Sequence, residues 1–162
     1  EGTILDKFNY ILTNKKFNEY LNAITVYETD RKFCHHDITH LLDTARICYI
    51  LVLENHLDIS KDIVYSTALL HDIGRYDEYY HGIPHEQSTN IIVEILKECN
   101  YSTSEIELIV SAISEHRTTN DRLLTLNDVI AKADKLSRLC FRCPAKSECY
   151  WSDTKKNNIL YL

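Results

Sequence analysis

The sequence predicts a single all-α domain, and three observations support this fold class. Apolar residues recur at helical spacing along nearly the whole chain, and no segment alternates with the period of two that marks a strand. The chain has 162 residues, the length of one domain with a buried core. With 44% hydrophobic residues, three glycines and two prolines, it lacks the composition of linkers or disordered segments. We therefore expect one compact helical bundle.

The first half of the chain contains four predicted helices. A short opening helix is expected around Ile4 to Leu12, and residues 17–27 carry the apolar stripe of a second. Asp37 is suited to the N-cap of a third helix, with His40 in its first turn. Ser60 is suited to the N-cap of a fourth, whose apolar run predicts near-complete burial.

The second half is predicted to contain a loop and three further helices. Residues 74–83 are polar and are expected to form a loop. Pro84 is well suited to a first helical position, which predicts a helix through residue 96. Capping boxes at residues 102–105 and 125–128 predict the starts of two more helices, the last of which carries Asp134.

The most informative segment is residues 68–75, with the sequence ALLHDIGR. A helix that runs into an adjacent histidine and aspartate and is closed by Gly74 delivers a nitrogen and an oxygen to one point. Mn, Fe, Co, Mg and Zn accept such donors, and a carboxylate that follows an apolar run is costly to bury unless it is paired or binds a metal. This segment closely resembles the signature of the HD superfamily of metal-dependent phosphohydrolases. The resemblance covers about residues 30 to 140 and implies a helical bundle of the HD-domain type.

The resemblance also implies a set of metal ligands. Matched residue by residue, the ligands of a first ion are His40, His71, Asp72 and Asp134. His85 and His116, the latter continuing an apolar helical stripe, resemble two additional histidines of the dinuclear branches. Their presence implies a second ion, with Asp72 as the bridging ligand.

Other polar residues near these segments are candidates for substrate contacts. Arg75 and Lys135 directly follow ligand segments, where a cation can neutralise a substrate phosphate or the negative end of a helix dipole. We take Asp72 and Arg75 as the catalytic candidates. His36 precedes its helix and is expected in solvent. The alternative, for His36 and for Lys135, is that the side chain contacts a metal ligand or a substrate phosphate.

A cysteine cluster lies near the C-terminal end. Cys140, Cys143 and Cys149 follow the pattern C-x2-C-x5-C, and three cysteines so close in a reducing compartment favour metal ligation over disulfides. The spacing resembles the last three cysteines of the iron–sulfur loop in some DNA-repair glycosylases, with Ala133 in place of the first. Cys34, in a loop, is the expected fourth ligand of a [4Fe–4S] cluster or a zinc ion. The alternative is a tail of unbound, reduced thiols.

Composition and the length of the apolar stretches limit the partners and the location that we expect for this protein. The formal net charge of −6 offers no basic surface for duplex nucleic acid or an anionic membrane. No stretch approaches about 18 uncharged apolar residues, and no secretion signal is evident, so we expect a cytoplasmic protein. We expect residues 1–29 to pack on a metal-binding core of residues 30–139, with a cysteine-rich tail at 140–162 in the same domain. The sequence does not indicate an oligomeric state.

Three functions are consistent with these features. The first is a metal-dependent phosphohydrolase that cleaves a phosphate ester of a small molecule, such as a nucleotide, with metal-activated water. The second is a di-iron oxygenase, because the resemblance extends to superfamily members with the same six ligands. The third is a non-enzymatic sensor that binds a metal and a nucleotide and responds to redox state through its cysteines.

Overall fold

The computed structural model describes residues 5–115 and 121–162, and within these ranges the chain is all-helical, as predicted. The helices are α1 (Phe8–Leu12), α2 (Lys15–Tyr27), α3 (Ile38–Glu54), α4 (Lys61–Leu70), α5 (Arg75–His81), α6 (Thr89–Glu98), α7 (Thr103–Ser114) and α8 (Leu126–Leu136). Three short 3-10 helices complete the order: η1 (His85–Gln87), η2 (Cys140–Arg142) and η3 (Lys146–Glu148). None of the helices in these ranges is long and apolar enough to cross a membrane.

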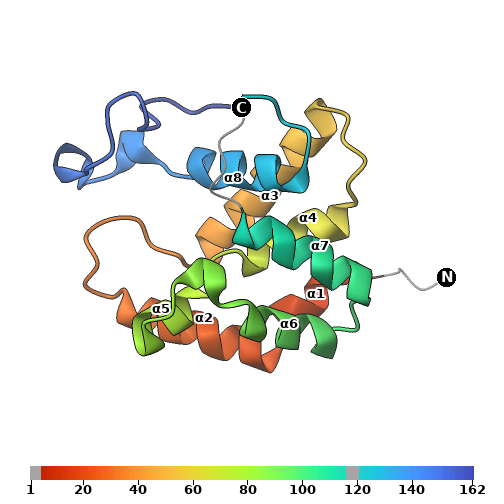
Figure 1. Ribbon diagram of the computed structural model, residues 1–162. Coiled ribbons are helices and arrows are strands. Elements are labelled where there is room, and N and C mark those ends of the chain that lie inside the picture. Colours follow the sequence, from red (N-terminus) through yellow and green to blue (C-terminus); the bar gives the residue numbers. More distant parts are fainter. Residues whose placement is uncertain (1–4, 116–120) are drawn as a thin grey trace.

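Helix α4 lies at the centre of the bundle. It packs against α3, α7, α1 and α8, and nearly all of its side chains from Ile63 to Leu70 are buried. Figure 1 shows α8 and α3 in the upper part of the molecule and α1, α2, α5 and α6 in the lower part. The end of α4 therefore lies in the interior, between the two parts.

The predicted helix caps are confirmed. The Asp37 side chain accepts a hydrogen bond of 3.0 Å from the backbone N–H of His40, and Ser60 caps α4 in the same way. Both capping boxes are complete, at Ser102 on α7 and Thr125 on α8. The cap on α3 places His40 in the first turn of that helix.

The prediction of a loop at residues 74–83 is wrong, because most of this segment forms helix α5. The ring of Tyr79 stacks on that of Tyr27 from α2, with centroids 4.2 Å apart. Packing on α2 thus stabilises a helix whose sequence has no continuous apolar stripe. Gly82, at φ 69°, ends α5 in the left-handed conformation that glycine adopts without strain.

The single helix predicted from Pro84 to residue 96 is also wrong, because the structure divides it into η1 and α6. Ser88, with φ −83° and ψ 61°, separates the two, and its hydroxyl donates a hydrogen bond to Asp77 on α5. Gly74 contacts the backbone of His85 so closely that an added Cβ would lie 2.3 Å from the His85 carbonyl oxygen. These contacts hold η1 against the start of α5, where Gly74, at φ −61°, allows the close packing.

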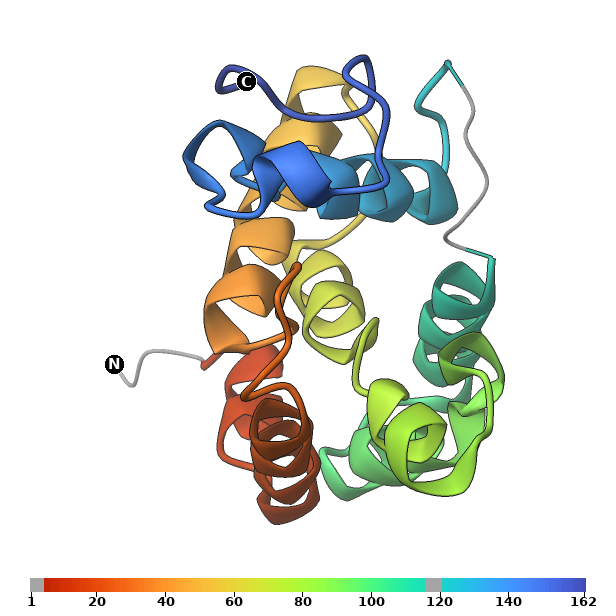
Figure 2. The same cartoon turned by 90° about the vertical axis from the view of Figure 1, so that its left-hand side faces the viewer.

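The C-terminal segment returns over the loop between α2 and α3. Figure 2 shows the segment in blue beside that loop, in orange. The Asn157 side-chain amide donates to the carbonyl oxygens of Lys135 and Arg138, at 2.6 and 2.8 Å. The tail is therefore tied to the carboxyl end of α8, where the peptide oxygens lack helical partners.

Candidate metal centre

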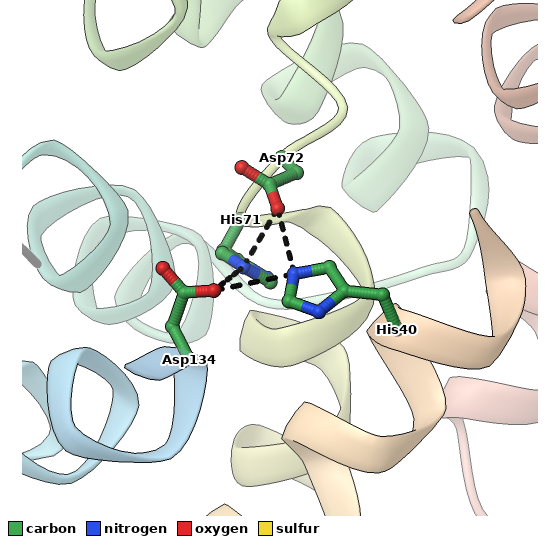
Figure 3. A group of neighbouring side chains, drawn as sticks. All are labelled: His40, His71, Asp72 and Asp134. Carbon is green, nitrogen blue, oxygen red and sulfur yellow. Dashed lines mark hydrogen bonds and ion pairs between the residues drawn. The ribbon is translucent and has the colours of Figure 1, made fainter. Parts of the chain in front are cut away.

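Three helices bring the four predicted ligands of the first ion together. His40 comes from the first turn of α3, His71 and Asp72 from the end of α4, and Asp134 from α8. Figure 3 shows these side chains pointing toward one another. His40 Nε2 lies 3.0 Å from Asp72 Oδ2 and 3.2 Å from Asp134 Oδ1. His71 Nε2 lies 3.0 and 3.5 Å from the same two oxygens.

This donor set fits a divalent metal ion. An ion with metal–donor bonds of about 2.1 Å holds adjacent donors about 3.0 to 3.4 Å apart, depending on the coordination geometry. The observed separations of 3.0 to 3.5 Å agree with that spacing. Two imidazole nitrogens and two carboxylate oxygens suit Fe, Mn, Co or Zn better than Cu(I), which prefers sulfur ligands.

Hydrogen bonds at the far side of each imidazole orient Nε2 toward the centre. His71 Nδ1 lies 2.6 Å from the Ala68 carbonyl oxygen, so this nitrogen carries the proton and donates it. His40 Nδ1 lies 3.1 Å from Ser137 Oγ, which itself donates to the Asp134 carbonyl oxygen at 2.6 Å. These partners indicate the tautomer in which Nε2 is the ligand atom for both histidines.

The electrostatics of the ion-free centre show how strongly it favours a cation. Burial opposes a charge on His71, but the carboxylates of Asp72 and Asp134 raise its pKa to about 10. Burial also opposes the anionic form of Asp72, yet the neighbouring His71, His36 and His40 hold its pKa well below its usual range. The pKa of Asp134 is lowered in the same way by His40 and His71. In the absence of an ion, the His71 imidazolium therefore lies between two carboxylates. A metal ion can replace this positive charge.

Two arginines contact the ligands. Arg75 Nε donates to Asp72 Oδ1 at 3.1 Å, which leaves Oδ2 directed at the centre. Arg138 lies one turn beyond Asp134, and its guanidinium nitrogen is 3.3 Å from His40 Nε2. Sequence reasoning missed Arg138, although its i,i+4 spacing from Asp134 could have placed it on the same side of α8.

A pocket of about 600 Å³ opens beside the centre. The Asp134 side chain, 28% exposed, is the one carboxylate among the described residues that line it. Five basic residues line the same pocket: Arg31, Arg75, Lys135, Arg138 and Lys155. Burial together with Lys155 lowers the pKa of Lys135. An acidic protein thus contains a strongly basic pocket.

His36 lines this pocket as well, but not in the way that we predicted. It precedes α3, as expected, yet it is 4% exposed and not in solvent. The reason is Glu28, which accepts hydrogen bonds from the backbone N–H of His36 at 2.8 Å and from its Nδ1 at 2.6 Å. Tyr79 donates to the same carboxylate at 2.5 Å. Glu28 was not predicted, because nothing in its local sequence marks a buried carboxylate.

The second ion remains a prediction. His85 is 3% exposed and lines the pocket with Asp134, and its Nδ1 lies 2.7 Å from Glu78 Oε2. Carboxylates often orient metal-binding histidines in this way. His85 does not belong to the group of four donors that lie within 4.8 Å of one another. His116 lies outside the described residues, beyond the end of α7.

The remaining prediction concerns cysteines. Cys34, Cys140, Cys143 and Cys149 line a second cavity, of about 670 Å³, and no disulfide joins any of them. The other two cysteines, Cys48 and Cys99, are 0% and 5% exposed in the helical core, as expected from their apolar faces.

Comparisons with known proteins place this chain in a family. A family model described as "HD domain" matches residues 37–139. The chain is 43% identical over 158 residues to an uncharacterized protein of Clostridium beijerinckii, a match that covers 97% of this chain and 99% of the relative. No solved structure matches the chain.

Proposed function

The chain belongs to the HD domain family, most of whose members are metal-dependent phosphohydrolases, and on this premise we propose that it hydrolyses a phosphate ester of a small molecule, such as a nucleotide. The observation that carries the proposal is the position of the metal centre at a basic pocket. Asp134 belongs to both, and five cationic side chains face the space beside it. A phosphate group is the substrate chemistry that such a pocket matches.

The side chains have distinct roles in this proposal. A divalent ion held by the four ligands would lower the pKa of a water molecule and polarise a phosphoryl oxygen. Arg75 and Arg138 neutralise the charge that develops on the phosphoryl group, while Arg75 also fixes the orientation of Asp72. We propose that His85 and His116 would hold a second ion, with Asp72 as a further ligand.

We assign proton transfer to His36. Burial lowers the pKa of His36, so the imidazole is neutral at pH 7. With Nδ1 donating to Glu28, Nε2 at the opposite end of the ring can accept a proton from the attacking water and deliver it to the leaving oxygen. Glu28 stabilises the transient imidazolium, as a carboxylate does in other His–carboxylate pairs.

The alternative reaction is that of a di-iron oxygenase, and the five cations of the pocket fit a phosphorylated substrate in either case. Hydrolysis supported by Mn or Mg without oxygen would separate the two. Iron-dependent oxygen consumption coupled to substrate would contradict the hydrolase.

The test is a metal-content and activity comparison of three proteins. The wild type is assayed with p-nitrophenyl phosphate, a phosphodiester and nucleoside 5′-phosphates in the presence of Mn, Fe, Co, Mg or Zn. We expect Asp72→Ala to lose both the bound ion and hydrolysis, because it removes a ligand and the acceptor of the Arg75 Nε hydrogen bond. His56→Asn is the control, because His56 is exposed and its positive φ of 52° suits asparagine. Full turnover by Asp72→Ala, or none by the wild type over the whole panel, would refute the assignment.

A further inference from the structure

We propose that Cys34, Cys140, Cys143 and Cys149 bind a [4Fe–4S] cluster, in a site separate from the HD metal centre. The four thiols come from two segments that are more than 100 residues apart in sequence, and all of them line one cavity. The residues lie just outside the HD match at 37–139, so the site is not part of what that match describes.

The tail is wound so that its cysteines recur at turn positions. The backbone N–H of Cys143 donates to the Cys140 carbonyl oxygen at 3.1 Å, and that of Cys149 donates to Lys146 at 3.4 Å. In a 3-10 turn, residues three apart project on the same side. The turn of η2 therefore directs Cys140 and Cys143 to one side, and η3 returns the chain to the cavity at Cys149.

The loop that carries Cys34 is held against this tail. Arg138 donates from a guanidinium nitrogen to the His35 carbonyl oxygen at 2.7 Å, and Lys32 forms an ion pair with Glu148. Arg31 Nε donates to the Cys34 carbonyl oxygen at 2.8 Å, which fixes the loop backbone at the cysteine itself. The fourth thiol is thus positioned across the cavity by contacts on both sides of it.

The charge around the cavity suits thiolates. Among the described residues, two carboxylates line it, Asp37 and Asp43. Six basic residues do so: Arg31, Lys32, Arg138, Arg142, Lys146 and Lys156. A cluster bound by four thiolates carries net negative charge, which the nearby cations offset.

The spacing of the thiols favours a cluster over a single zinc ion. A Zn–S bond of about 2.3 Å places the four sulfurs of a zinc site about 3.8 Å apart. In the part of the chain that the structure describes, no three of these thiol sulfurs lie within 4.8 Å of one another. In a [4Fe–4S] cluster each thiolate binds a different iron, and the sulfurs stand farther apart.

Acid-labile sulfide is the measurement that tests the cluster, because iron alone can also bind at the HD centre. The full chain is purified anaerobically, and iron, sulfide and the visible spectrum are measured before and after incubation with ferric iron, sulfide and a thiol reductant. We expect about four sulfides per chain and a broad visible absorption band. Cys143→Ala and Cys34→Ala should lose nearly all of the sulfide, whereas Cys99→Ala, a core substitution, should retain it.

A second pair of variants separates the two sites. Asp72→Ala should lose the HD ion yet keep its sulfide, while Cys143→Ala should keep the HD ion. This readout does not depend on phosphatase activity, so failure of the proposed function would leave the cluster intact as a finding. Wild-type protein that holds no sulfide even after reconstitution, or that binds one zinc ion at these thiols instead, would overturn the proposal. Retention of sulfide by both cysteine variants would do the same.

Discussion

Asp72 is the residue on which the centre depends most, because its two oxygens serve different partners. Oδ2 faces His40 and His71, and Oδ1 accepts from Arg75. The carboxylate therefore links the two histidines of the centre to Arg75, for which we propose a role in phosphate binding. A change at this position disturbs both at once.

Metal binding should become tighter as pH rises. In the ion-free protein, burial opposes the charge on His71, but the adjacent carboxylates raise its pKa to about 10, so the imidazole is protonated below that pH. The incoming ion must displace this proton, and the affinity should therefore rise about tenfold per pH unit between about pH 6 and 9. Calorimetry with Mn in buffers of different ionisation enthalpy measures the released proton directly. An affinity that is the same at both ends of this range would contradict the coupling.

Replacement of His36 should impair proton transfer while leaving the metal in place. We expect His36→Gln to lower kcat by roughly 10²- to 10⁴-fold, the usual contribution of a general acid or base. The loss should be larger for alkyl phosphates than for p-nitrophenyl phosphate, because a poor leaving group needs the proton more. Glu28→Gln keeps a hydrogen-bond acceptor without the charge and should show a smaller loss. Equal losses for both substrates would show that His36 only positions other groups.

At the residue scale, the ligands were predictable and their supports were not. The His–Asp doublet at the end of an apolar helix points to His71 and Asp72, and the resemblance to the HD signature adds His40 and Asp134. Glu28 escaped notice because it ends α2 and meets His36 only after the loop folds back. Pairing of that kind depends on the path of the loop, about which the local sequence carries no signal.

At the scale of elements, the sequence predicted the capped helices but not α5. Asp37, Ser60, Ser102 and Thr125 mark helix starts with local hydrogen bonds, which sequence patterns report directly. Helix α5 owes its stability to tyrosines that pack on α2, and its junction with η1 to contact at Gly74. Such tertiary contacts override local helix propensity, and local sequence patterns do not reveal them.

The junction between α5 and η1 gives a prediction at this scale. We expect Gly74→Ala to destabilise the protein by about 1 to 3 kcal/mol, because the new Cβ meets backbone atoms of His85 that cannot easily yield. The backbone of Gly74, at φ −61°, is itself compatible with alanine, so the cost is steric. Chemical denaturation measures it.

Gly82→Asn serves as the comparison for this substitution. Nothing lies within 4 Å of an added Cβ at Gly82, and asparagine tolerates the left-handed backbone. We expect a change of less than about 1 kcal/mol. A Gly74→Ala protein as stable as Gly82→Asn would mean that η1 shifts freely.

For the whole molecule, net charge and local charge point in opposite directions. The chain carries a formal charge of −6, yet five cations face the pocket beside the metal centre. From the composition we expect no nucleic-acid partner, but the composition does not reveal where the basic residues gather. That arrangement arises from three separate segments of the chain: the loop before α3, the junction of α4 and α5, and the end of α8 with the tail.

Salt dependence distinguishes the two charges. If repulsion of an anionic substrate by the net charge dominates, added salt weakens the repulsion and kcat/KM rises. If attraction by the pocket dominates, added salt weakens the attraction and kcat/KM falls. The proposed substrate would pass within a few ångströms of the five cations that line the pocket, whereas any charge farther away than the Debye length, about 10 Å at about 0.1 M salt, is largely screened. We therefore expect kcat/KM for a phosphate ester to fall as salt rises from about 0.05 to 0.5 M. An uncharged salt substitute such as sucrose controls for viscosity, and a rise in kcat/KM would contradict the proposed pocket.

The two cavities share a wall, since Cys34, Cys149 and Trp151 line both of them. Occupants of adjoining spaces that depend on the same side chains are energetically coupled, and the coupling is reciprocal. If a cluster tightens the binding of a phosphate in the basic pocket, that phosphate must strengthen retention of the cluster by the same factor. Oxidation of the cluster would then weaken substrate binding, and a high concentration of substrate would protect the cluster. The shared wall would in this way couple oxygen exposure to the turnover of phosphate esters.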